Sequence, residues 1–170
     1  MKPSVRSAAI TLALLGITAC TTLYADPIGP STVTLTVRNV SGSVLDFAFY
    51  EGGERCTDRR IVKDGIAPFE TRTFRILAGK EAAFTASQDL GMHPSVGGVT
   101  FVGCNPTISF TPDMGQQYIA VLGQERGCSI SLLQASADAT DLRTASPAPA
   151  LERQWRTPWD ESGPFCEPKT

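Results

Sequence analysis

The chain is short of the residues that catalysis and nucleic-acid binding most often need. Its 170 residues include a single histidine, His93, and its 15 Lys and Arg are outnumbered by 17 Asp and Glu. One histidine restricts acid–base chemistry near neutral pH and leaves few nitrogen ligands for a transition metal. A chain without an excess of positive charge is poorly suited to follow a phosphate backbone, so the sequence argues against a nucleic-acid partner.

The chain also lacks a convincing helical period between residues 32 and 133, and it has no long apolar run at its N-terminus. The uncharged apolar run there covers residues 8–19. These roughly 12 residues fall below the ~17–25 of a membrane-spanning helix but within the ~7–15 of a signal-peptide core. Lys2 and Arg6 precede the run and supply a short positive region. We therefore expect residues 1–19 to be a secretion signal.

The run ends at Ile17-Thr18-Ala19-Cys20, an aliphatic residue and two small residues before a cysteine. This motif resembles the bacterial lipobox, which implies cleavage after Ala19 and a lipid on the Cys20 sulfur. Two or three acyl chains would hold the protein on the membrane, whereas one binds marginally. Thr21 stands where many inner-membrane lipoproteins of Gram-negative bacteria carry Asp. The resemblance thus implies the inner leaflet of the outer membrane, facing the periplasm. An ordinary signal with a chance cysteine is the alternative.

Removal of the signal leaves 151 residues with 13 basic and 17 acidic side chains, because Lys2 and Arg6 are lost. A chain of this length supports one domain around one core. We expect a lipidated tether over residues 20–31, a core over 32–133, and a loop with a C-terminal tail over 134–170.

Four cysteines remain once Cys20 carries lipid, and an even number in an exported chain predicts two disulfides. Three pairings are possible, and spacing alone does not choose among them. We favour Cys104–Cys128, which flank two predicted strands, together with Cys56–Cys166, which would attach the tail. A zinc site is disfavoured because the chain has no C-x-x-C pair.

Short alternating segments occupy most of the predicted core. Val33, Leu35 and Val37 alternate with polar residues, as in a strand with one buried face. Strands recur at spacings near ~8–12 residues, with turns between them. The predicted strands are residues 33–38, 44–50, 59–62, 69–77, 82–87, 99–102, 107–110, 118–122, 128–133 and 151–156. The pattern predicts an all-β fold: an antiparallel β-sandwich of immunoglobulin-like or transthyretin-like type, or a small open barrel.

Two regions contain candidate contact residues. Around Cys56, acidic residues that could form a hydrolytic pair or hold calcium are interleaved with Arg59 and Arg60. Such mixed charge is typical of a solvated face, and any function there would favour the two arginines as contacts for an acidic partner. In the tail, Trp155 and Trp159 either form a binding surface or cover one end of the sandwich.

His93 lies in a Gly- and Pro-rich stretch, residues 91–98, which we interpret as a loop. A histidine there could act as a general base but is more typical of a solvated loop or a partner contact. The sequence shows no convergent set of acid, base and nucleophile. We therefore expect no enzymatic activity, no cofactor and no metal.

The stretch from Cys104 to Cys128, with Phe110-Thr111-Pro112, Gly115 and Tyr118, is similar to that in small uncharacterised lipoproteins of Gram-negative bacteria. The similarity covers roughly 25 residues. It implies a sandwich and the Cys104–Cys128 pairing, and it carries no implication about catalysis.

Together these features predict a membrane-anchored, non-enzymatic module that binds another envelope protein or assists an assembly. The alternative is a periplasmic inhibitor or immunity protein directed against a cell-wall hydrolase, with residues 91–98 entering the active site. Both predicted functions rest on the expected location in the cell envelope and on the fold class rather than on a recognisable site.

Overall fold

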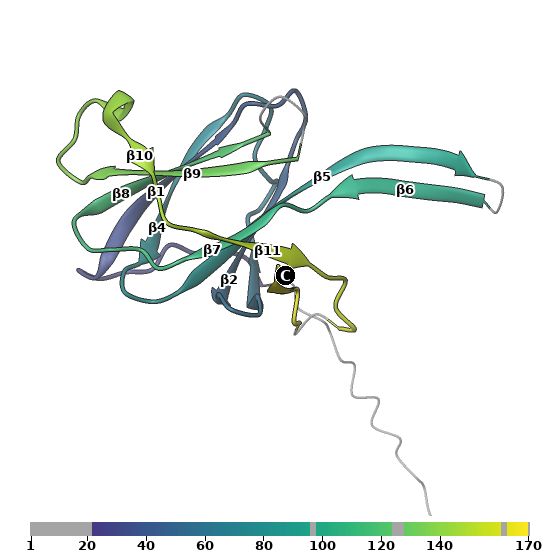
Figure 1. Ribbon diagram of the computed structural model, residues 1–170, viewed down its shortest axis with the longest axis horizontal. Coiled ribbons are helices and arrows are strands. Elements are labelled where there is room, and N and C mark those ends of the chain that lie inside the picture. The colour runs from purple at the N-terminus through teal and green to yellow at the C-terminus, as the bar shows by residue number, and fades with distance from the viewer. Residues whose placement is uncertain (1–21, 96–97, 124–127, 161–162, 170) are drawn as a thin grey trace, which may run out of the picture.

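The protein is built from two β-sheets that pack face to face (Figure 1). The computed structural model describes residues 22–95, 98–123, 128–160 and 163–169. The predicted signal, the lipobox and Cys20 lie outside these residues. The strands are β1 Thr32–Asn39, β2 Asp46–Gly52, β3 Thr57–Ile61, β4 Thr71–Leu77, β5 Ala82–Ser95, β6 Gly98–Cys104, β7 Thr107–Phe110, β8 Gln116–Leu122, β9 Ile130–Ser136, β10 Ser146–Pro147, β11 Leu151–Trp155 and β12 Cys166–Pro168.

The first sheet has the order β10-β9-β8-β1-β4, and the second has the order β12-β11-β7-β5-β2-β3 with β6 added to β5. Among the described strands, all pairings are antiparallel except that of β1 with β8, and the isolated bridge between Leu23 and Ile61 is also parallel. A 3-10 turn, Leu142–Thr144, precedes β10. Within the described parts of the chain, we find no helix with the length and apolar character to span a membrane. The all-β sandwich predicted from the sequence is confirmed.

Alternating side chains of both sheets fill the space between them. In β1, Val33, Leu35 and Val37 are buried, as the alternation predicts. An aromatic group in the middle joins the sheets: the ring of Phe74 in β4 lies 5.2 Å from that of Phe49 and 6.1 Å from that of Phe47, both in β2. Each such side chain contributes about 1.5–3 kcal/mol when fully buried.

The C-terminal tail covers the outer face of the second sheet. Phe165 is buried there against Tyr50 of β2, with 5.4 Å between the ring centroids. The disulfide Cys56–Cys166 fixes the tail beside β3, and Cys104–Cys128 forms the second bridge, so the favoured pairing is confirmed. β11 was expected to be the last strand, but β12 pairs along its outer side.

The structure differs from the sequence-based expectation over residues 91–98. We interpreted this stretch as a loop, yet β5 continues to Ser95 and β6 begins at Gly98. Glycine and proline are typical of loops, but proline is tolerated in strands where its missing N–H has no partner to lose. Pro94 lies in a two-stranded ribbon outside the sandwich, where this condition is easily met. The expectation of a loop was therefore wrong.

Candidate functional site

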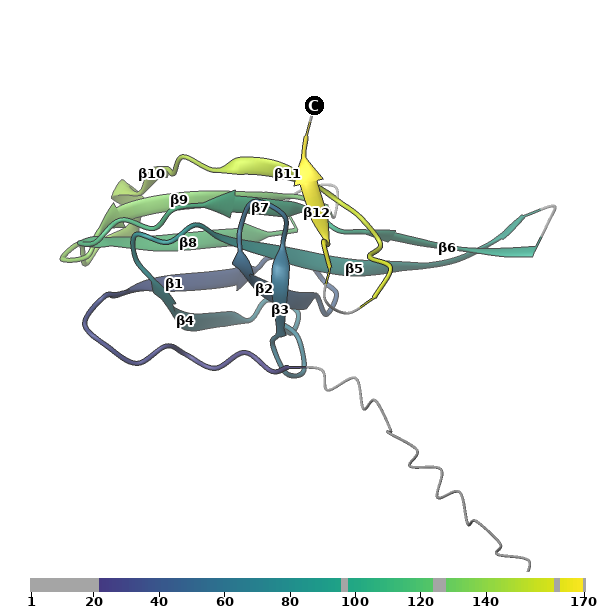
Figure 2. The same ribbon diagram turned by 90° about the horizontal axis from the view of Figure 1, so that it is seen from below.

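A two-stranded arm leaves the sandwich at one end. We define the arm as residues 88–95 and 98–104, which comprise the second half of β5 and all of β6. Figures 1 and 2 show it from two directions as a ribbon that extends well past the sheets. The first half of β5 lies inside the second sheet, between β2 and β7. The arm is thus a continuation of a central strand rather than a loose loop.

The base of the arm is covalently fixed to the other sheet. Cys104 ends β6 opposite Gln88, and its disulfide partner Cys128 lies just before β9 of the first sheet. One residue pair further out, a bulge interrupts the pairing between Asp89 and Gly91. The Gly91 amide donates to the Asp89 carboxylate over 2.8 Å, and Gly91 has a φ of 102°, which suits a residue without a Cβ.

The backbone register continues along the arm. Met92 lies opposite Phe101, His93 lies opposite Thr100, and Pro94 lies opposite Val99. The two strands of the arm are therefore paired as far out as Ser95 and Gly98.

The edges of the arm are available for further strand pairing. Among the described residues, β6 pairs with β5 alone, and β5 has no second partner beyond Ser87. An open edge presents unpaired backbone N–H and C=O groups to which another chain can add a strand. A two-stranded ribbon is also only marginally stable alone in water. A strand of a partner that paired with the arm would satisfy the backbone groups of its open edge.

The connection between β11 and β12 lies at the same end of the sandwich as the base of the arm (Figures 1 and 2). Trp159 in this connection is 100% exposed. Exposed tryptophan is enriched at binding hot spots because it buries a large area with little loss of entropy. The arm and Trp159 are the two features of this end that are suited to contact another protein.

A second feature lies at the N-terminal side, where residues 22–27 form a strap over the edges of both sheets. The amide of Tyr24 donates to the carbonyl of Ile61 at the end of β3 over 2.9 Å, and the Ile61 amide donates to the Thr22 carbonyl. Towards the other sheet, the Tyr24 hydroxyl donates to the Arg75 carbonyl in β4, and the Asp26 carboxylate accepts from the Arg75 amide. The strap thereby bridges β3 and β4.

A cavity of about 450 Å³ lies beneath the strap. Tyr24 stacks on Phe49 at 4.1 Å, and burial, followed by the nearby Asp26 charge, raises the pKa of the Tyr24 phenol. Ile76 and Leu77 of β4 contribute to the apolar lining. The volume falls within the range of about 300–1,000 Å³ typical of small-molecule sites.

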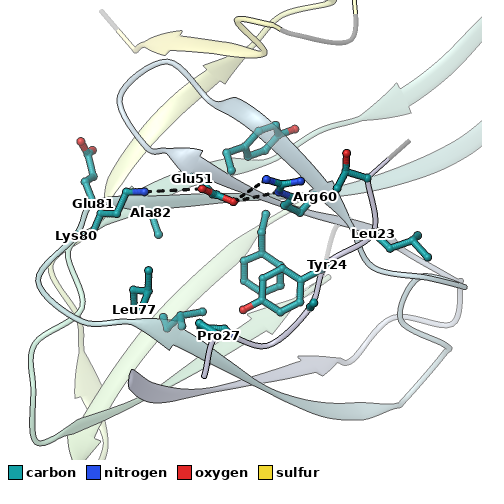
Figure 3. Close-up of a pocket in the computed structure, with 14 residues that line it drawn as sticks. Leu23, Tyr24, Pro27, Glu51, Arg60, Leu77, Lys80, Glu81 and Ala82 are labelled. Carbon is teal, nitrogen blue, oxygen red and sulfur yellow. Dashed lines mark hydrogen bonds and ion pairs between the residues drawn. The ribbon is translucent and has the colours of Figure 1, made fainter. Parts of the chain in front are cut away.

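Charged groups line one side of this cavity. Figure 3 shows Glu51 between Lys80 and Arg60, with Leu77 and Tyr24 on the facing side. The Arg60 guanidinium lies 3.0 Å from the Glu51 carboxylate, and the Lys80 ammonium lies 3.9 Å from it. Apolar lining with a few charged groups at one side is the arrangement expected for an amphipathic ligand.

The structure separates the residues that the sequence singled out as contacts. Arg60 lines the cavity, whereas the Arg59 guanidinium lies 5.0 Å from the centre of the Phe165 ring. Trp155 is half-buried and hydrogen-bonds to the Tyr50 hydroxyl. His93 lies within the arm. Both Arg59 and Trp155 thus belong to the contacts that hold the tail on the second sheet.

Sequence reasoning missed the cavity and the strap. The strap's residues precede the first predicted strand and end in the Asp26-Pro27 pair, so the sequence predicts only part of a tether there. Tyr24 is the one aromatic residue of the strap, and a single aromatic residue predicts neither a strand nor a cavity.

Comparison of the chain with protein-family models, curated proteins and solved structures found no match. The fold and its two features define the class of molecule: a β-sandwich with two disulfides, a projecting β-ribbon arm and a strapped apolar cavity.

Proposed function

We propose that the protein is a lipid-anchored, non-enzymatic envelope lipoprotein that binds another envelope protein through the arm. The observation that carries this proposal is the projecting ribbon with its open edges. Strand addition to such an edge gives affinity through backbone hydrogen bonds and specificity through alternate side chains. The occupant we expect is an extended segment of the partner.

The lipobox-like motif and the disulfides support a location in the cell envelope. All four cysteines after residue 20 are paired, and disulfides of this kind persist in oxidising compartments such as the periplasm. The strap begins at Thr22, two residues after Cys20, and two residues span at most about 7 Å. A lipid on Cys20 would thus lie close to β3 and hold the sandwich near the membrane surface. Thr21 supports a place in the outer membrane, because many inner-membrane lipoproteins of Gram-negative bacteria carry Asp at this position.

The disulfides agree with a role without catalysis. Cys56, Cys104, Cys128 and Cys166 are paired and therefore offer no thiolate for nucleophilic attack. Our proposal is accordingly a binding role, with no cofactor and no metal, as the sequence predicts.

Removal of the arm tests this proposal. Asp89 and Gly103 lie directly opposite one another, so a two-residue Asn-Gly turn can replace residues 90–102 and close a shortened hairpin. Both disulfides remain in this variant. We expect it to fold with near-normal stability but to lose the partner that co-purifies with the intact protein from solubilised envelopes. Retention of that partner by the shortened protein would refute the role of the arm.

Radiolabelled palmitate tests the anchor separately. The wild type should incorporate the label, and Cys20→Ser should not, whereas the neighbouring change Thr21→Ser should leave labelling intact. Label in the Cys20→Ser protein would show a different modification site.

A second function is favoured by the same arm. Inhibitors of hydrolases insert a projecting element into the active-site cleft. The sequence proposes residues 91–98 for that purpose, and the described part of this stretch, residues 91–95 and 98, lies in the outer part of the arm. An inhibitor would reduce peptidoglycan hydrolysis by a periplasmic extract in proportion to its concentration, and the arm-shortened variant would not. An assembly module would leave hydrolysis unchanged in both forms.

A further inference from the structure

We infer that the cavity beneath the strap is a binding site for a single-chain aliphatic carboxylate, that is, for a fatty acid. This inference does not rest on the proposed function of the arm. The cavity lies between residues of both sheets, and its lining combines the rings of Tyr24 and Phe49 with the aliphatic side chains of Ile76 and Leu77. Such a lining favours a flexible apolar chain by burying its surface.

The charges along the cavity favour an anionic head group. Glu51 faces two cations, Arg60 and Lys80, so this group of three carries one positive charge in excess. The fourth charged lining residue, Glu81, is neutralised by Arg153, whose side chain is only 7% exposed and lies 2.9 Å away. The charged side of the cavity is therefore complementary to a single negative charge.

Lys80 is the cation best placed to bind the head group. Its ammonium lies 3.9 Å from Glu51, a looser contact than the 3.0 Å of Arg60, and its side chain is half exposed. It can turn towards a ligand carboxylate without breaking a tight hydrogen bond. A carboxylate at Lys80 would leave the aliphatic chain to run over Leu77 towards Tyr24 (Figure 3).

Dodecanoate below its micellar concentration is a suitable probe, with binding measured by isothermal titration calorimetry. The protein is the chain from Thr21 onwards, exported behind a signal without a lipobox. All described strands and both disulfides lie within residues 22–169, so this chain retains the complete sandwich. Its lack of Cys20 prevents an attached lipid from competing. We expect saturable one-to-one binding, and weaker binding of dodecylamine than of dodecanoate.

Two variants and their controls test the location of the site. Leu77→Glu places a charge in the apolar lining and should weaken dodecanoate binding at least about tenfold. Leu151→Glu is the control, because Leu151 is 60% exposed, compared with 44% for Leu77, and does not line the cavity. Lys80→Gln should weaken binding about threefold. Lys63→Gln is its control, because Lys63 is exposed and does not line the cavity. This change should alter the affinity for dodecanoate by less than about twofold.

The thermal midpoints of all four variants should match that of the parent chain, since each change is at a solvent-accessible position. If Leu77→Glu fails to fold, Lys80→Gln still tests the site. Absence of dodecanoate binding to the parent chain would overturn the inference. Equal loss in Leu77→Glu and Leu151→Glu, or tighter binding of dodecylamine than of dodecanoate, would overturn it as well.

Discussion

At the scale of single residues, two aromatic side chains of the tail lie in opposite environments. Phe165 is 1% exposed, between the Tyr50 ring and the Arg59 guanidinium. Trp159, six residues earlier, is fully exposed. The tail therefore contains both a packing residue and a residue free for contact, which the sequence alone could not distinguish.

Replacement of these two residues should give different results. Phe165→Ala should lower the free energy of unfolding by about 3 kcal/mol, because it leaves a cavity, and should lower Tm by roughly 6–12 °C. Trp159→Ala should change the free energy by less than about 0.5 kcal/mol. Differential scanning calorimetry of both variants measures this contrast, and equal shifts in Tm would contradict it.

The buried tyrosines predict a loss of stability in alkali. Burial raises the pKa of Tyr24, Tyr50 and Tyr118 above the ordinary value of 10.0. The folded protein therefore keeps these protons at a pH where the unfolded chain releases them, so stability is intact below pH 10 and falls as the pH rises above it. Urea unfolding at pH 8 and pH 10.5 measures the fall. The loss of unfolding free energy between the two pH values should be smaller in Tyr24→Phe than in the wild type. An equal loss in both proteins would argue against a contribution from Tyr24.

At the scale of elements, one disulfide fixes the C-terminal tail and the other fixes the base of the arm, and the two differ in their exposure to solvent. Cys56–Cys166 is buried beneath the tail, with its cysteines 0% and 1% exposed. Cys104–Cys128 is half-buried at the base of the arm. Its loss would free the arm's base from the first sheet while leaving the tail in place.

Stepwise reduction should follow this difference in exposure. Under limiting reductant, Cys104 and Cys128 should become alkylated before Cys56 and Cys166, as peptide mapping can measure. Separate Cys-to-Ala double variants should lose about 3.5 kcal/mol for the 24-residue separation and about 4.8 kcal/mol for the 110-residue separation, in the chain-entropy model. Earlier alkylation of the buried pair would contradict the assigned exposure.

Most elements of the sandwich could be predicted because alternation in strands such as β1 directly reports one buried face. The sequence predicts residues 99–102 of β6 as a strand but not the extension of β5 to Ser95, because this part of β5 lies outside the sandwich, where no core imposes alternation. Gly91 lies at the bulge and Pro94 lies in the ribbon. In a sequence, however, glycine and proline are also the residues that predict a loop. The cavity depends on contacts between the strap and strands that are distant in sequence, and no local pattern encodes such contacts.

At the scale of the whole molecule, three features form one arrangement. The strap fixes the start of the described chain to β3 and β4. The sandwich holds the first half of β5 between β2 and β7, and the arm continues β5 beyond the sheets. An anchor at Cys20 would thus be joined to the arm through a folded body rather than a flexible linker. This arrangement suits a protein that presents one binding element from a membrane surface.

Site-specific photo-crosslinking in intact cells tests the central claim most directly. A photoreactive amino acid at Thr100 in the arm should form an adduct with one envelope protein, whereas the same group at Phe69, which is 74% exposed on the body, should not. Excess unlabelled wild-type protein should compete with the adduct at position 100. An adduct at position 69 with none at position 100 would contradict the account.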